Sequence, residues 1–86
     1  MNLEPEDVAA ATRRLKRARG QLDAVIRMLE EGVDCEEVVP QITAAATAVR
    51  RAGYLVIAEG MTKCLTQAER DEQQEQQLQK MLLSLA

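Results

Sequence analysis

The chain has 86 residues, of which 47% are hydrophobic and 29% are charged, with a net charge of −3 and no histidine, phenylalanine or tryptophan. A chain of this length forms one small domain, for which assembly into oligomers is a common way to bury enough apolar surface. Abundant Ala, Leu, Glu, Gln and Arg with a single aromatic residue favour an all-α fold with an aliphatic core. An enzyme is disfavoured, because the chain has no histidine, no Gly-rich phosphate loop and no acid–base pair on one face. No signal peptide and no apolar run of ~18 residues is present, so we expect a cytoplasmic protein without a membrane partner.

The first predicted helix, about residues 5–31, carries a heptad pattern. Two sets of apolar residues, each repeating every seven positions, are separated by three positions, as the a and d positions of a helical bundle are. The first set is Val8, Leu15, Leu22 and Leu29, and the second is Ala11, Ala18 and Val25. Gly32 follows directly and is a typical residue just beyond the end of a helix. The pattern predicts a helix that packs along its whole length against other helices.

The second predicted helix, about residues 34–65, begins with Asp34 as N-cap and has Glu37 three residues later, a spacing similar to a capping box. An apolar stripe runs from Cys35 to Cys64. Pro40 lies near its start, where it either kinks the first turns or moves the regular start of the helix to its own position. The sequence leaves both outcomes open.

The third predicted helix, about residues 67–85, is rich in Gln and Glu and has a short apolar stripe. This stripe consists of Leu78, Met81, Leu82 and Leu85. We expect this stripe to pack only when subunits assemble. Because no repeat and no Gly/Ser linker divides the chain, residues 1–86 are interpreted as a single helical domain.

Cys35 and Cys64 are the only cysteines and are separated by 29 positions, which on one helix places them within about 20° of the same face. Along the helix axis they would be about 43 Å apart, whereas a disulfide needs Cα atoms within about 7 Å. They therefore cannot react within one chain. An antiparallel second copy would place Cys35 of one subunit beside Cys64 of the other and form two equivalent dithiol sites. The alternative is that both cysteines are small apolar packing residues.

The first predicted helix also contains five cationic residues within seven positions. These are Arg13, Arg14, Lys16, Arg17 and Arg19. Arg50 and Arg51 form a second basic step on the next helix. Although the net charge is negative, phosphate binding depends on local cation density, so a DNA-binding patch and a solvated helix face are both open interpretations.

The run RLKRARGQLD, residues 14–23, is followed by the run RMLE, the pair Gln41-Ile42 and the two widely spaced cysteines. This combination resembles the CsoR/RcnR family of bacterial transcriptional repressors over about residues 8–65. The resemblance implies a three-helix subunit, an antiparallel four-helix-bundle homodimer and a homotetramer formed as a dimer of dimers. It also implies that operator DNA is bound through basic helical surfaces and is released when a ligand occupies a site between subunits.

Within this resemblance, Arg14 and Arg51 match basic residues that are implicated in operator binding in the family. Lys16, Arg17 and Arg19 are expected to be secondary contributors. All five would contact the phosphate backbone, so the affinity for operator DNA should fall steeply with salt.

The chain lacks one of the copper ligands that the resemblance to the copper-sensing relatives implies. Those relatives bind Cu(I) through two cysteines and a histidine four residues before the second cysteine, a position that is Gly60 here. Because both cysteines are kept and the histidine is absent, the chain is more similar to the persulfide-sensing, CstR-like branch of the family. That branch implies a repressor that senses low-molecular-weight persulfides or polysulfides through an intersubunit Cys35/Cys64 dithiol, without a cofactor. A di- or polysulfide bridge between the two cysteines would release the operator.

Two alternatives remain at this stage. The first is a Cu(I)-sensing repressor in which the same two thiolates, Cys35 and Cys64, bind the metal, because two thiolates suffice for a soft metal ion. The second is a structural helical module that binds a partner protein and shows no sequence-selective DNA binding.

Overall fold

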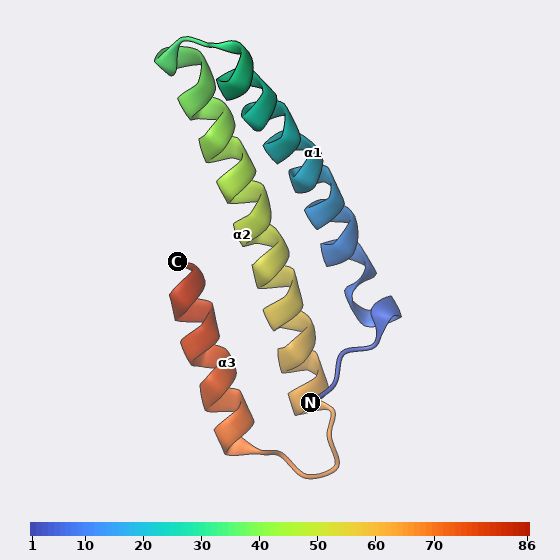
Figure 1. Cartoon of the computed structure of the whole chain (residues 1–86). Coiled ribbons are helices and arrows are strands. Elements are labelled where there is room, and N and C mark those ends of the chain that lie inside the picture. The colour runs from blue at the N-terminus through green and yellow to red at the C-terminus, as the bar shows by residue number, and fades with distance from the viewer.

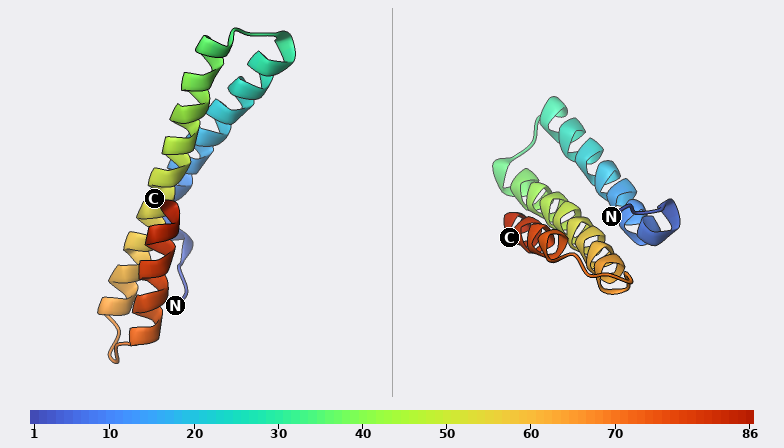
Figure 2. Two further views of the ribbon diagram at one scale, coloured as in Figure 1. Left: turned by 90° about the vertical axis from the view of Figure 1, so that its left-hand side faces the viewer. Right: turned by 90° about the horizontal axis from the view of Figure 1, so that it is seen from below.

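The computed structural model describes residues 1–86 and contains helices only (Figure 1). A 3-10 helix, η1 (Pro5–Val8), leads into α1 (Ala9–Glu31), which is followed by α2 (Cys35–Leu65) and α3 (Glu72–Leu85). The predicted all-α fold with three helices is confirmed. α2 is the central helix, with α1 along one side and α3 against its C-terminal half on the other side (Figure 2).

The turn between α1 and α2 contains Gly32, which has a positive φ of 91°. Glycine reaches this region without a steric penalty, which explains why α1 ends where the sequence predicts. α2 begins at Cys35, with Pro40 inside the helix, so the proline does not move the helix start to its own position. The predicted side-chain cap at Asp34 is wrong. Its backbone carbonyl accepts the N–H groups of Glu37 and Val38, while its carboxylate makes no capping hydrogen bond.

Small residues form the contact between α1 and α2. The residues buried on α1 are Ala11, Ala18 and Val25, and those on the facing half of α2 are Val38, Ala45 and Ala52. Only one of the two predicted heptad sets is therefore buried within the chain. The leucines of the other set remain largely in solvent, with Leu15 44%, Leu22 43% and Leu29 56% exposed.

α3 packs on glycines of α2. An added Cβ atom at Gly60 would lie 3.0 Å from Leu78, and one at Gly53 would lie 2.9 Å from Leu85, so both glycines permit close approach of the two helices. The expectation that this stripe packs only on assembly is thus wrong for Leu78 and Leu85, whereas Met81 and Leu82 remain exposed.

α3 begins at Glu72 rather than at the predicted position 67. The Asp71 carboxylate accepts the N–H of Gln73 at 2.9 Å and of Gln74 at 3.4 Å, which is a regular N-cap. The residues before it form a turn. A carboxylate that satisfies two free N–H groups fixes the start of the helix more strongly than the helix propensity of the preceding residues does.

The single chain is a long, thin molecule of 55 × 25 × 13 Å with a radius of gyration of 16.6 Å, compared with about 12 Å for a compact domain of this length. Its accessible surface is 6489 Å², compared with about 5,000 Å² for a compact monomer of its mass. Only 10 of the 86 residues are buried. The apolar surface left exposed is what a second copy would cover, and the dimer and tetramer remain predictions. No helix combines the length and the apolar character needed to span a membrane.

Candidate functional site

The two cysteines lie at opposite ends of α2. Cys35 is its first residue and is exposed, and Cys64 lies in its last turn and is buried. Because α2 is continuous between them, the two thiols of one chain are about 43 Å apart and cannot be bridged. The half of α2 that carries Cys35 is not covered by α3 (Figure 1). Each chain therefore presents one exposed thiol and one buried thiol, at opposite ends of the molecule.

Cys64 is fully buried in a small apolar cluster with Ile57 and Leu78. Its Sγ lies 3.6 Å from the Sδ of Met1 and 3.6 Å from the Oε1 of Gln74. A thiol has one proton and donates to one of these acceptors at a time. Three separate segments therefore meet at this sulfur: the N-terminal residues, α2 and α3.

Gly60 lies one turn before Cys64. An added Cβ at this position would lie 3.4 Å from the Sδ of Met1, in addition to its close contact with Leu78. The space next to Gly60, on the side where a longer side chain would extend, is thus filled by side chains of the N-terminal segment and of α3. No group of three or more His, Cys, Asp or Glu side chains gathers in the chain to hold a metal ion.

The N-terminal segment is attached to α2 beside Cys64 by an ion pair. The Nζ of Lys63 lies 2.9 Å from the Oδ2 of Asp7, and the backbone N–H of Glu4 donates to the same oxygen at 3.0 Å. The hydrogen bond from Lys63, followed by the one from the Glu4 backbone, lowers the pKa of Asp7. The hydrogen bond to Asp7 raises the pKa of Lys63. Sequence reasoning missed this contact, because the partners are 56 positions apart and no local pattern connects them.

Three of the predicted DNA-binding residues lie together in a groove between α1 and α2. Arg14, Arg17 and Arg51 line an open groove of about 380 Å³. Its other lining residues are Gln21, Ala44, Thr47 and Ala48, so no acidic side chain is present. Neither of the two ion pairs in the structure involves these arginines. Their guanidinium groups are therefore free to bind anions.

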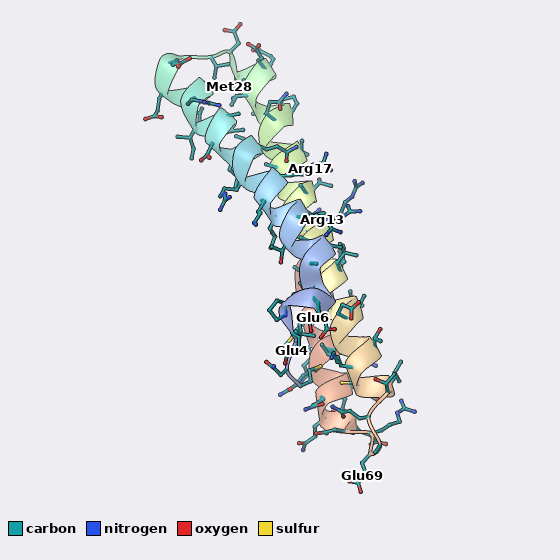
Figure 3. All side chains as sticks on the ribbon, turned by 90° about the vertical axis from the view of Figure 1, so that its right-hand side faces the viewer. Glu4, Glu6, Arg13, Arg17, Met28 and Glu69 are labelled. Atoms are coloured by element: carbon teal, nitrogen blue, oxygen red, sulfur yellow. The ribbon has the colours of Figure 1, made fainter.

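The remaining predicted DNA-binding residues, Lys16 and Arg19, do not line this groove. Both are exposed on other faces of α1. The charges are also segregated along the molecule. Figure 3 shows Arg13 and Arg17 in the middle of the rod, whereas Glu4, Glu6 and Glu69 lie towards one end.

Comparison with known proteins gives one consistent result. A family model described as "Metal-sensitive transcriptional repressor" matches residues 7–84. The copper-sensing transcriptional repressor CsoR of Mycobacterium ulcerans is 39% identical over 62 residues, which is 72% of this chain and 53% of the relative. CsoR of Mycobacterium tuberculosis is 37% identical over 62 residues, covering 72% of this chain and 52% of the relative. The copper-sensing transcriptional repressor RicR of the same species is 36% identical over 56 residues, covering 65% and 58%.

The chain thus spans about half the length of the curated relatives that it matches. No solved structure shows a significant match.

Proposed function

Because the chain belongs to the family of metal-sensitive transcriptional repressors, we propose that it binds operator DNA and releases it when Cu(I) binds between two subunits. The family consists of repressors and not of enzymes, which confirms the expectation that this chain is not an enzyme. Membership of this family also favours a DNA-binding protein over a purely structural helical module. The names of the relatives support Cu(I) as the effector more strongly than persulfides.

The basic groove supports the DNA-binding part of the proposal. Arg14, Arg17 and Arg51 come from two helices and lie together without acidic neighbours in the groove. Guanidinium groups bind phosphate oxygens through charge-assisted hydrogen bonds. In an antiparallel dimer or tetramer the groove is repeated by symmetry, so several phosphates are contacted at once.

The observation that carries the sensing part is the placement of the cysteines. One chain holds an exposed Cys35 and a buried Cys64 at opposite ends of one helix. Antiparallel pairing of two such helices brings each exposed thiol to the buried thiol of the partner. Two thiolates form a soft donor set that fits Cu(I) and disfavours hard cations such as Mg²⁺. When bound, Cu(I) would link two helices of different subunits and favour one arrangement of the basic grooves.

Sensing of persulfides through the same two cysteines is the second candidate function, and Gly60 favours it. The family resemblance implies a histidine at this position as the third copper ligand, and the chain contains no histidine. In this mechanism a persulfide RSSH transfers its outer sulfur to Cys35 and leaves as RSH. The Cys64 thiolate of the partner then attacks the Cys35 sulfur and displaces hydrosulfide. The two thiols are oxidised to a disulfide, and the transferred sulfur is reduced to sulfide.

A DNA-release assay separates the two functions. The protein would first select its own operator from a random DNA library, and fluorescence anisotropy of that fragment would then be followed under anaerobic conditions. Release by Cu(I) buffered to the levels of a reducing cytoplasm, without a covalent dimer on a non-reducing gel, supports the copper sensor. Release by a persulfide donor, with Cys35 and Cys64 peptides joined through two or more sulfurs, supports the second candidate. Cys35→Ala and Cys64→Ala are the control variants, and full release in either would contradict both mechanisms.

A further inference from the structure

The thioether of Met1 lies at the buried cysteine. Its Sδ is 3.6 Å from the Sγ of Cys64, which is the only hydrogen bond between two sulfur atoms in the structure. We propose that Met1 is the third soft ligand of the Cu(I) site and takes the part that a histidine at position 60 would play. This inference rests on the proposed function for the identity of the metal and for the participation of the partner's cysteine.

The separation of the two sulfurs fits a shared ion. With metal–sulfur bonds of about 2.3 Å, two sulfurs on one ion lie roughly 3.8–4.0 Å apart in tetrahedral or trigonal geometry. The Met1 and Cys64 sulfurs, at 3.6 Å, are within a few tenths of an ångström of this separation. Thioether and thiolate sulfur are both ligands that select Cu(I). The Met1 side chain is 43% exposed, so it can make this adjustment without disturbing the core.

Gly60 explains why Met1 can reach this place. The Sδ of Met1 would be 3.4 Å from a Cβ at position 60, and Leu78 would be 3.0 Å from it. A side chain at position 60 would therefore contact both Leu78 and Met1. Glycine leaves the space next to α2 in which the thioether of Met1 lies.

The N-terminal segment is also held in place before any ligand binds. The Asp7–Lys63 ion pair attaches it to α2 at the residue next to Cys64, and the Glu4 N–H to Asp7 hydrogen bond orders the residues between. Ordering a donor in advance lowers the entropic cost of binding. The apolar side chains of Ile57 and Leu78 limit access of water to Cys64. A neutral thioether adds a ligand to two thiolates without adding charge to this buried position.

The test uses protein labelled with ¹³C at the methionine methyl groups, of which there are four. The chain would be released from a cleavable N-terminal fusion so that residue 1 can be changed, with intact mass used to verify that residue 1 is retained. Cu(I) would be added anaerobically from a chelator of known affinity. We expect one equivalent per subunit to shift the Met1 methyl resonance. We expect Met1→Leu to lower the Cu(I) affinity at least tenfold, because even ligand-supporting groups contribute about 10–100-fold.

Met61→Leu is the matched control, because Met61 packs against the same cluster without a sulfur contact to Cys64. It should change the Cu(I) affinity less than about threefold. An unmoved Met1 resonance, or Met1→Leu protein that binds Cu(I) as tightly as the unmodified chain, overturns the inference. Operator release on the same samples tests the proposed function separately. If Cu(I) shifts the Met1 resonance but does not release the operator, the Met1 ligand is supported and the copper-sensing function is contradicted. If Met1→Leu protein releases the operator at the same Cu(I) concentration as the unmodified chain, the Met1 ligand is contradicted and the copper-sensing function is supported.

Discussion

Asp7 and Lys63 form an ion pair of 2.9 Å that joins the first turn of the chain to the last turns of α2. Both ends of the pair lie next to segments that carry candidate site residues. Asp7 lies in η1, two residues before the basic helix α1, and Lys63 immediately precedes Cys64. The contact therefore links the buried thiol to the helix that carries Arg14 and Arg17 by a path within one subunit.

The first prediction concerns the pH range of this contact. The pKa of Asp7 is lowered from 3.8, so the contribution of the pair is present above that value and is lost as the pH falls through the depressed pKa. The pKa of Lys63 is raised from 10.5, so the contribution is present below that value and is lost as the pH rises through the raised pKa. Between these limits the ion pair should stay intact, as followed by the ¹³C resonance of the Asp7 carboxyl group. Asp7→Asn should shift the Met1 methyl resonance at neutral pH, because the N-terminal segment loses its attachment to Lys63.

The control for Asp7→Asn is Glu75→Gln, which removes the other ion pair, Arg70–Glu75, at 2.8 Å. That pair joins α3 to the turn before it, away from the N-terminal segment. If both variants moved the Met1 resonance equally, the Asp7–Lys63 contact would have no specific part in holding the segment.

The second prediction is that the exposed leucines of α1 form the interface between subunits. Leu22 is 43% exposed, so its further burial contributes about 1 kcal/mol per subunit. In a symmetric dimer both copies of Leu22 contribute, so Leu22→Gln should reduce the favourable free energy of association by about 2 kcal/mol. This loss raises the dimer dissociation constant roughly 30-fold. Sedimentation velocity at micromolar concentration measures this. Asp23→Gln, at the next and also exposed position, should leave the dimer unchanged, and a folded monomer in the unmodified protein would contradict the proposed assembly.

The third prediction ranks the basic residues. Arg14→Ala and Arg51→Ala should each weaken operator binding and flatten its salt dependence, since each lost phosphate contact removes about 0.9 from the slope of log affinity against log salt. Arg17→Ala should behave in the same way, because Arg17 lines the same groove. Lys16→Ala and Arg19→Ala should have smaller effects, because these residues lie outside it. Equal effects at all five positions would indicate diffuse attraction to α1 and not binding in the groove.

The fourth prediction compares two glycines. Gly20 has no atom within 4 Å of an added Cβ, so Gly20→Ala should stabilise the protein by about 0.5–1 kcal/mol through the better helix propensity of alanine. At Gly60 the same gain is opposed by contact with Leu78 at 3.0 Å, and overpacking costs about 1–3 kcal/mol. Gly60→Ala should therefore be destabilising in thermal unfolding. Stabilisation by both variants would show that α3 moves away from α2 without cost.

Helix periodicity and helix-end residues predicted most of this fold. The seven-residue spacing in α1 and the Gly32 stop depend on contacts within a few residues, which a sequence displays directly. The start of α3 was misplaced, because a single carboxylate at Asp71 outweighed the helix propensity of the residues before it. The sequence left the effect of Pro40 open, and the structure places this exposed proline inside α2.

In the candidate thiol site, the sequence predicted only the residues of α2. Cys35 and Cys64 were identified because they are unique residue types on one helix face. Met1 was not, because its proximity to Cys64 depends on how the N-terminal segment crosses α2. The joint position of Arg14, Arg17 and Arg51 likewise required the register of two antiparallel helices. The contacts of the candidate sites that the sequence did not predict are therefore those between segments far apart in the chain.

Because both cysteines lie on one unbroken helix, two different cysteine variants should complement each other in a mixed dimer. In the proposed antiparallel dimer, each site takes Cys35 from one chain and Cys64 from the other. A mixed dimer of one Cys35→Ala chain and one Cys64→Ala chain then has one complete site and one site with no thiol at all, although neither variant forms a complete site with itself. A purified mixed dimer should thus have half of the effector sites of the unmodified dimer. Co-expression of two inactive alleles should restore about a quarter of them, because mixed dimers are half of a randomly paired population. A site contained within one subunit would never produce this complementation.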